Sequence, residues 1–207
     1  MNKALLLSEI AKKIEDCRRC DLWNGTTHAV PGEGLPEAKV VFIGEGPGFH
    51  EDRLGRPFVG QAGKLLDKLI VSVGLSRDEV FICNVVKHRA PENRDPLPTE
   101  IAACKVWLDQ QLEIINPKVT VTLGRYSLAR FLPRVKISTV HGQAIKIKSQ
   151  VVIPMYHPAA ALRNGAVLRS LEADFQKNSQ LLKNPDNAVS TAKLNESEED
   201  PNQMSFF

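Results

Sequence analysis

Residues 39–48 read KVVFIGEGPG. The first five residues, KVVFI, are a nearly all-apolar run, and a glycine-rich turn follows them. An unbroken apolar run of this length is typical of a strand that is buried on both faces, as in a parallel sheet. Three similar runs follow at residues 80–83, 119–123 and 151–154. We therefore expect a central, mostly parallel sheet of four strands.

Segments with helical periodicity separate these runs. Residues 60–73 carry apolar side chains at helical spacing, and residues 98–115 begin at a proline and stop before Asn116-Pro117. Further helices are expected over residues 3–16, from residue 125 onward, and over 167–182, with a hairpin around Gly142. Alternating strands and helices predict an α/β fold with three layers, α/β/α.

The composition is that of one globular domain with a tail. Of the 207 residues, 43% are hydrophobic and 25% are charged. The 27 Lys and Arg against 24 Asp and Glu give a net charge of only +3, which neither demands nor excludes a nucleic-acid partner, and any basic surface would be local. We expect a domain over residues 1–183 and a disordered polar tail over 184–207. With no bilayer-length apolar run and no signal-peptide core, neither a transmembrane nor a secreted protein is expected.

Cysteines occur at positions 17, 20, 83 and 104. Cys17 and Cys20 form a C-x-x-C motif, which is typical of a redox dithiol or of half a metal site. The motif follows a helical pattern, whereas a thioredoxin-like dithiol should follow a strand. A disulfide framework is disfavoured without a secretory signal. We therefore expect half of a metal site here and the other half far along the chain.

Residues suited to chemistry gather in the loops after the expected strands. In an α/β sheet, ligands bind at the carboxyl ends of the strands. The glycines of GEGPG at 44–48 let a ligand approach the backbone closely, although the same pattern fits a plain strand-to-helix turn. The loop is not a Walker phosphate loop, because no Gly-Lys-Ser/Thr follows.

Three other loop residues have both a structural and a functional interpretation. Phe58 suits a staple onto the next helix or a stacking platform for a planar ligand. Asn84 offers a donor and an acceptor to a base edge. His157 suits a helix cap or a donor to a developing anion. A local basic patch follows Asn84 and comprises Lys87, Arg89 and Arg94.

Four sequence words, taken in order, resemble those of the family 4 uracil-DNA glycosylases, the iron–sulfur branch of the uracil-DNA glycosylase superfamily. The words are GEGPG at 44–48, GRPFVGQAGKLLD at 55–67, NVVKHRAPENRDP at 84–96 and YHPAAALRN at 156–164. The resemblance runs from about Cys17 to about Leu182. It implies a repair enzyme that flips deoxyuridine out of single- or double-stranded DNA and hydrolyses its N-glycosidic bond, leaving an abasic site.

The resemblance also implies roles for single residues. Phe58 matches the ring that stacks on uracil, Asn84 matches the amide that reads O4 and N3, and His157 matches the histidine near O2. Gly44 and Gly46 belong to the base pocket. Gly46 stands where other branches carry a water-activating aspartate, so any general base is left to two carboxylates, Glu45 and Glu51. The expected DNA contacts are Lys87, Arg89, Arg94 and the wedge loop with Leu162 and Arg163.

By the same resemblance, a [4Fe–4S] cluster is expected. Cys17, Cys20 and Cys104 match three of the family's four cysteine ligands, and the remaining position holds His88. Histidine can ligate cluster iron. Cys83 competes for this place, but a buried thiol also serves as a small apolar core residue, so we expect His88. A covalently trapping branch also carries a histidine here together with a KRRIH word, which this sequence lacks, so we expect turnover.

Two other classes of function stay open. One is a non-catalytic nucleic-acid-binding module of the same fold. The other is a zinc-stabilised enzyme acting on another base, because three thiolates and an imidazole also suit zinc. Residues 203–207, QMSFF, resemble a shortened sliding-clamp-binding peptide and suggest a clamp as a partner. The expected protein is a monomer of prokaryotic type, cytoplasmic and associated with the nucleoid, without membrane contact.

Overall fold

The computed structural model describes residues 2–187 and 193–194. Its core is a sheet in the order β1-β3-β2-β4-β6-β5-β7. The strands are β1 (Glu33–Gly34), β2 (Val40–Gly44), β3 (Phe81–Asn84), β4 (Val119–Leu123), β5 (Ile145–Ile147), β6 (Gln150–Met155) and β7 (Lys193–Leu194). The four inner strands β3, β2, β4 and β6 are mutually parallel. They are the four apolar runs, so the predicted parallel sheet is confirmed.

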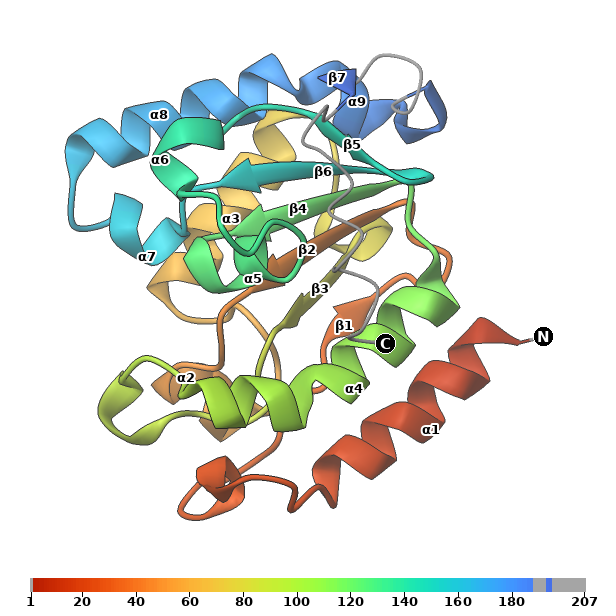
Figure 1. Cartoon of the computed structure of the whole chain (residues 1–207), viewed down its shortest axis with the longest axis vertical. Helices are drawn as coiled ribbons and strands as arrows, with labels where there is room; N and C mark the ends of the chain where they lie inside the picture. Colours follow the sequence, from red (N-terminus) through yellow and green to blue (C-terminus); the bar gives the residue numbers. More distant parts are fainter. Residues whose placement is uncertain (1, 188–192, 195–207) are drawn as a thin grey trace.

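The helices pack on both faces of this sheet (Figure 1). They are α1 (Lys3–Glu15), α2 (Phe49–Leu54), α3 (Gln61–Ser72), α4 (Pro98–Ile115), α5 (Arg125–Ala129), α6 (Ile137–Val140), α7 (Pro158–Ala161), α8 (Gly165–Lys177) and α9 (Ser179–Lys183). Short 3₁₀ turns are η1 (Asp21–Trp23), η2 (Arg77–Glu79), η3 (Pro91–Asn93) and η4 (Pro185–Asn187).

Alternate residues of the inner strands supply two separate cores. Val40 and Phe42 of β2 face α3 and α8, where Phe42 stacks on Phe175 with ring centroids 6.0 Å apart. Val41 and Ile43 face the other way, toward α1 and α4. Because the inner strands are covered on both faces, the predicted three-layer α/β/α architecture is confirmed.

The structure corrects two expected elements. The hairpin of β5 and β6 turns near Lys148, not around Gly142, and the residues before Gly142 form α6. Gly142 instead donates its N–H to the Pro154 carbonyl at 2.8 Å, which ties the α6 segment to β6. The helix expected over 167–182 is broken at Asn178, which separates α8 from α9 and donates its side-chain amide to the Gly142 carbonyl.

The edges of the sheet were not predicted. β1 pairs antiparallel with β3, and β7 pairs parallel with β5. The expected boundary near residue 183 stays a prediction, and residues 203–207 with their clamp-like peptide lie outside the described residues. Within the part of the chain that the structure describes, no helix is long and apolar enough to cross a bilayer.

Candidate active site

The carboxyl ends of β2 and β3 place three predicted site residues together. Gly44 ends β2 directly beside Asn84, which ends β3. A Cβ atom on Gly44 would lie 2.4 Å from Asn84 Oδ1 and 2.5 Å from Phe58 Cζ. Only glycine fits at this close approach. The absent side chain therefore lets the Asn84 amide and the Phe58 ring meet over the Gly44 backbone.

The Asn84 side chain is buried but incompletely satisfied. The residue is 1% exposed, and its Oδ1 accepts no hydrogen bond from the described residues. A buried acceptor without a donor costs about 1–3 kcal/mol. Such a group at the carboxyl end of a strand is suited to accept a hydrogen bond from a ligand or from a water molecule.

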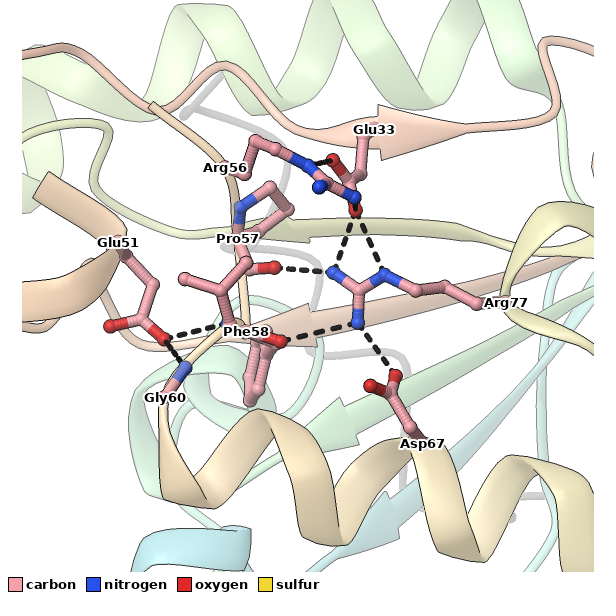
Figure 2. A network of polar contacts seen from close by, with 9 residues as sticks. Glu33, Glu51, Arg56, Pro57, Phe58, Gly60, Asp67 and Arg77 are labelled. Atoms are coloured by element: carbon pink, nitrogen blue, oxygen red, sulfur yellow. Dashed lines mark hydrogen bonds and ion pairs between the residues drawn. The ribbon is translucent and has the colours of Figure 1, made fainter. Parts of the chain in front are cut away.

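The Phe58 ring faces His157. Their ring centroids are 5.7 Å apart and their planes differ by 29°. Glu51 holds the backbone after Phe58, because its Oε1 accepts the N–H groups of Val59 and Gly60, both at 2.8 Å (Figure 2). The loop therefore presents an aromatic face next to the Asn84 amide and the His157 imidazole.

His157 follows β6 and caps α7. Its Nδ1 accepts the Ala159 N–H at 3.1 Å, so a neutral ring carries its proton on Nε2. Burial lowers the pKa of His157 to about 4, partly opposed by the nearby Glu51 carboxylate. Gly124, with φ of +92°, lies against His157 at the end of β4. The imidazole is therefore a neutral, fixed donor near pH 7.

The two candidate general bases have different surroundings. Burial and the Asp95 carboxylate raise the pKa of Glu45, whereas Arg125 opposes the shift. Glu51 accepts hydrogen bonds from two loop amides, those of Val59 and Gly60, so it stabilises the conformation of the loop. At Gly46 a Cβ would lie 2.7 Å from Val86 Cγ2, so Val86 crowds the place of a longer side chain. Glu45 therefore stays the better candidate to orient a water molecule.

Known proteins match this chain over nearly all of the region described above. A sequence profile described as the Uracil DNA glycosylase superfamily matches residues 31–183. The chain belongs to this superfamily. A type-4 uracil-DNA glycosylase of Sulfurisphaera tokodaii is 48% identical over 189 residues, which cover 86% of each chain. Another, from Archaeoglobus fulgidus, is 44% identical over 185 residues, covering 84% of this chain and 92% of the relative.

A third type-4 uracil-DNA glycosylase, from Thermotoga maritima, is 43% identical over 183 residues, covering 86% of this chain and 95% of that relative. Such identity over most of both chains identifies this member of the glycosylase superfamily with the type-4 branch. The predicted family is therefore confirmed. The words that carried the prediction are those that supply Gly44, Phe58, Asn84 and His157.

Arg125 is a candidate site residue of this glycosylase that the sequence did not reveal. It follows Gly124 at the end of β4 and contacts the Asp95 carboxylate and the Tyr126 hydroxyl. Its side chain is 64% exposed. Its position in the sequence could have indicated it, because it directly follows an inner strand, and the loops after the other inner strands had already supplied site residues. Arg125 is close enough to Glu45 to oppose the rise in the pKa of that carboxyl, and an exposed cation there is suited to a DNA phosphate.

The expected DNA-contact residues divide into exposed and buried ones. Leu162 is 51% exposed, and Arg163 beside it is also exposed, as a wedge loop requires. Arg89 lies over the ring of Phe49, with 5.2 Å between its guanidinium carbon and the ring centroid. Arg94 forms a bidentate pair with Glu100 at 2.7 and 2.9 Å.

Lys87 requires a correction. The residue is only 1% exposed, and its ammonium donates to the oxygens of Pro31, Asn84 and Gln111. The bond to the Asn84 carbonyl is 2.9 Å and that to Gln111 Oε1 is 2.7 Å. With its donors used inside the protein, Lys87 cannot reach a DNA phosphate. It supports the backbone of the pocket instead.

Lys87→Met is expected to lower the free energy of unfolding without changing how DNA affinity depends on salt. The three oxygens lose a buried donor, and each such loss costs about 1–3 kcal/mol. Urea unfolding and binding titrations over a salt series measure the two quantities. The comparison variant is Arg163→Ala. It removes an exposed cation, so it should reduce the salt slope by about 1. A reduced slope in Lys87→Met would restore the original DNA-contact prediction.

The predicted metal ligands come from three segments on the α4 side of the sheet. Cys17 and Cys20 lie between α1 and η1, Cys104 lies on α4, and His88 follows β3. Trp107 donates its indole N–H to Cys17 Sγ at 3.2 Å. Among residues 2–187 and 193–194, no three His, Cys, Asp or Glu side chains are grouped closely enough to bind a single metal ion.

Proposed function

We propose that this chain hydrolyses the N-glycosidic bond of deoxyuridine in DNA, releasing uracil and leaving an abasic site. The observation that carries the proposal is that Asn84 Oδ1, buried beside the Phe58 ring and Gly44, has no hydrogen-bond donor within the described part of the chain. Uracil has an N3–H that can donate to this oxygen, whereas cytosine has only an acceptor at N3. A fixed amide therefore selects uracil against the normal base.

The pocket residues would divide the work of excision. Phe58 stacks on the extracted base, and Asn84 reads its edge. His157 would donate its Nε2–H to the uracil oxygen on which negative charge develops as the bond breaks. Glu45 would orient the water that adds to the sugar. Leu162, exposed beyond α7, would fill the space that the base leaves in the duplex.

A cleavage assay tests the activity. Oligonucleotides with U·G, U·A or single-stranded U are incubated with the protein and treated with alkali, which cuts at abasic sites. We expect strand cleavage of the uracil substrates and none of a matched cytosine substrate. The two alternative classes predict no uracil release from any substrate, and that result would refute the proposal.

We also propose that Cys17, Cys20, Cys104 and His88 hold a [4Fe–4S] cluster. In support, the cysteines are free thiols, and Cys17 and Cys20 are close enough to Cys104 to act on its pKa. Arg18, inside the C-x-x-C motif, likewise acts on the pKa of His88, whereas Cys83 is enclosed in the core with Val41 and Ile43. A cluster separates its ligands more widely than one ion does. Its role would be structural, joining the segment after α1 to α4 and the loop after β3.

Burial raises the pKa of Cys104 to about 11, so this thiol stays protonated without a metal. Ligation requires the thiolate, and metal binding would release the proton. We expect His88→Cys and Cys83→Ser to retain iron, and His88→Ala to lose iron or fold poorly. Iron content and visible absorbance measure this and separate iron from zinc. Loss of colour in Cys83→Ser together with its retention in His88→Ala would reverse the choice of ligand.

A sliding clamp as a second partner is a proposal from the sequence alone. It rests on residues 203–207, which lie outside the described residues. Calorimetry of the full chain and of a chain that ends at Pro201 against the cognate clamp tests it. Binding only by the full chain supports the proposal, and equal binding by both forms, or by neither, contradicts it. The same titrations with light scattering would test the expected monomer.

A further inference from the structure

The aromatic face of the pocket stands on a strained backbone. Phe58 has φ of +51°. A left-handed conformation costs a non-glycine residue about 1–2 kcal/mol. Such a conformation persists only where the surrounding structure imposes it. The groups that contact the peptide units on either side of the Phe58 Cα therefore determine where the ring points.

Arg77 contacts both of these peptide units. Its Nη1 donates to the Phe58 carbonyl at 3.2 Å, and its Nη2 donates to the Pro57 carbonyl (Figure 2). The torsions φ and ψ of Phe58 together set how these two peptide planes are turned relative to each other. A single planar guanidinium that binds both carbonyls therefore fixes the conformation that places the ring in the pocket.

The guanidinium is itself held from two other elements. Its Nε donates to Glu33 Oε1 of β1 at 2.8 Å, and its Nη1 donates to Asp67 Oδ1 of α3 at 2.7 Å. Arg77 lies in η2, four residues before β3, the strand that ends at Asn84. The side chain is 19% exposed. Arg77 thus connects the Phe58 loop to the same framework that carries the base-reading amide.

Other contacts hold the opposite side of the loop. A Cβ on Gly63 would lie 1.9 Å from the Phe58 carbonyl oxygen, so α3 begins in direct contact with this peptide. Glu51 accepts the Val59 and Gly60 N–H groups from the side of α2. Figure 2 shows Arg77 and Glu51 on opposite sides of Phe58. Of these two side chains, Arg77 is the one that binds the carbonyls flanking the strained residue.

We propose that Arg77 is a positioning residue for uracil excision, which acts by holding Phe58 in its left-handed conformation. This inference rests on the proposed function. Without the guanidinium, the Phe58 backbone can relax to negative φ and turn the ring away from Asn84 and His157. The extracted base would then lose its stacking partner, while the surface that binds DNA would be unchanged.

The experiment uses the full chain and single-turnover excision of a U·G duplex. Arg77→Gln should lower the maximal rate by roughly 10²-fold, the size of effect that a misplaced contact group causes. The half-saturating DNA concentration should stay within about twofold of the wild type, as expected for an interaction that matters in the transition state. Arg77→Lys should lower the rate by less, because it keeps the charge. It should still be slower than the wild type, because an ammonium cannot bind both carbonyls as the planar guanidinium does.

Arg56→Gln is the matched control. Arg56 binds the same Glu33 carboxylate, at 2.7 Å. Among the described residues, its guanidinium has no hydrogen bond to the Pro57 or Phe58 carbonyl. Its side chain is 60% exposed, so its loss should leave the rate within about twofold of the wild type. If Arg77→Gln fails to fold by circular dichroism, Arg77→Lys carries the test. A normal rate in folded Arg77 variants would overturn the proposal.

A double-mutant cycle separates positioning from a general structural role. In a Phe58→Ala background, Arg77→Gln should lower the rate by less than about twofold, because the ring that it positions is gone. A repeated loss of roughly 10²-fold in that background would overturn the proposal. Hydrogen exchange at Val59 and Gly60 gives a readout that needs no activity. Faster exchange in Arg77→Gln than in Arg56→Gln supports the positioning role, and equal exchange contradicts it. This comparison stays valid even if the wild type releases no uracil and the proposed function fails.

Discussion

Replacing Asn84 with alanine is expected to reduce uracil excision by about 10²-fold or more while the protein loses no stability. The variant removes the amide that reads the base edge, and the polar edge of the extracted uracil then has no partner in the pocket. Asn84 Oδ1 already has no hydrogen-bond donor among the residues that the structure describes. Removing a buried acceptor that is not satisfied relieves a cost of about 1–3 kcal/mol instead of creating one.

Asn178→Ala is a matched control for this prediction. Asn178 is also a buried asparagine, at 2% exposed, but its amide donates to the carbonyls of Gly142 and Asp174. Its loss should lower the free energy of unfolding by about 1 kcal/mol and leave the excision rate unchanged. Single-turnover kinetics and urea unfolding of both variants are the measurements. Near-normal excision by Asn84→Ala would show that the base is read elsewhere.

The pocket was predictable because it lies where the sheet pattern places it. Asn84 and His157 follow apolar runs, and the carboxyl ends of parallel strands meet at one edge of the sheet. Gly44 ends the first of these runs. Their location at one edge of the sheet therefore follows from the parallel strands, whereas the distances between them depend on the strand order. The family resemblance added the identity of the ligand, which strand periodicity cannot supply.

Other features depend on tertiary contacts that no local pattern records. Lys87 stands in a basic-looking run beside His88 and Arg89, yet it turns inward because Gln111 of α4 supplies an acceptor. The carbonyl of Phe58, the residue with positive φ, accepts a hydrogen bond from Arg77, nineteen residues away. Strands of two or three residues, such as β1 and β5, are too short for any periodicity to be recognised.

His157→Ala is expected to lower the single-turnover excision rate by about 10²-fold or more, with DNA affinity unchanged, because one donor to the developing anion is lost. The Ala159 N–H occupies Nδ1, so the proton that remains for uracil is on Nε2. His157→Gln keeps an N–H donor on a side chain of similar reach and should retain more activity than alanine. A His157→Ala variant that is defective only in DNA binding would contradict this role.

The pH dependence of this variant pair follows from burial of the ring. Burial lowers the pKa of His157 to about 4 in the folded protein, from an ordinary value of 6.5. The imidazole is therefore neutral from pH 5 to pH 8, and its donor does not titrate in that range. The excision rate of the wild type should therefore show no step near pH 6.5 that can be assigned to His157. A loss of excision as the pH rises through about 6.5, present in the wild type and absent from His157→Ala, would mean that the cationic ring is the active form.

The free energy of unfolding should depend on pH between 6.5 and 4. In the unfolded chain His157 takes up a proton near pH 6.5, whereas in the folded protein it does so only near pH 4. Between these values the unfolded state binds more protons, so the free energy of unfolding falls as the pH is lowered from 6.5 to 4. Urea unfolding at pH 7, 5.5 and 4.5 measures this contribution, which should be absent from His157→Gln. A wild type and a His157→Gln variant with parallel pH dependence would show that the folded ring titrates at its ordinary pKa, and the neutral donor would have to be abandoned.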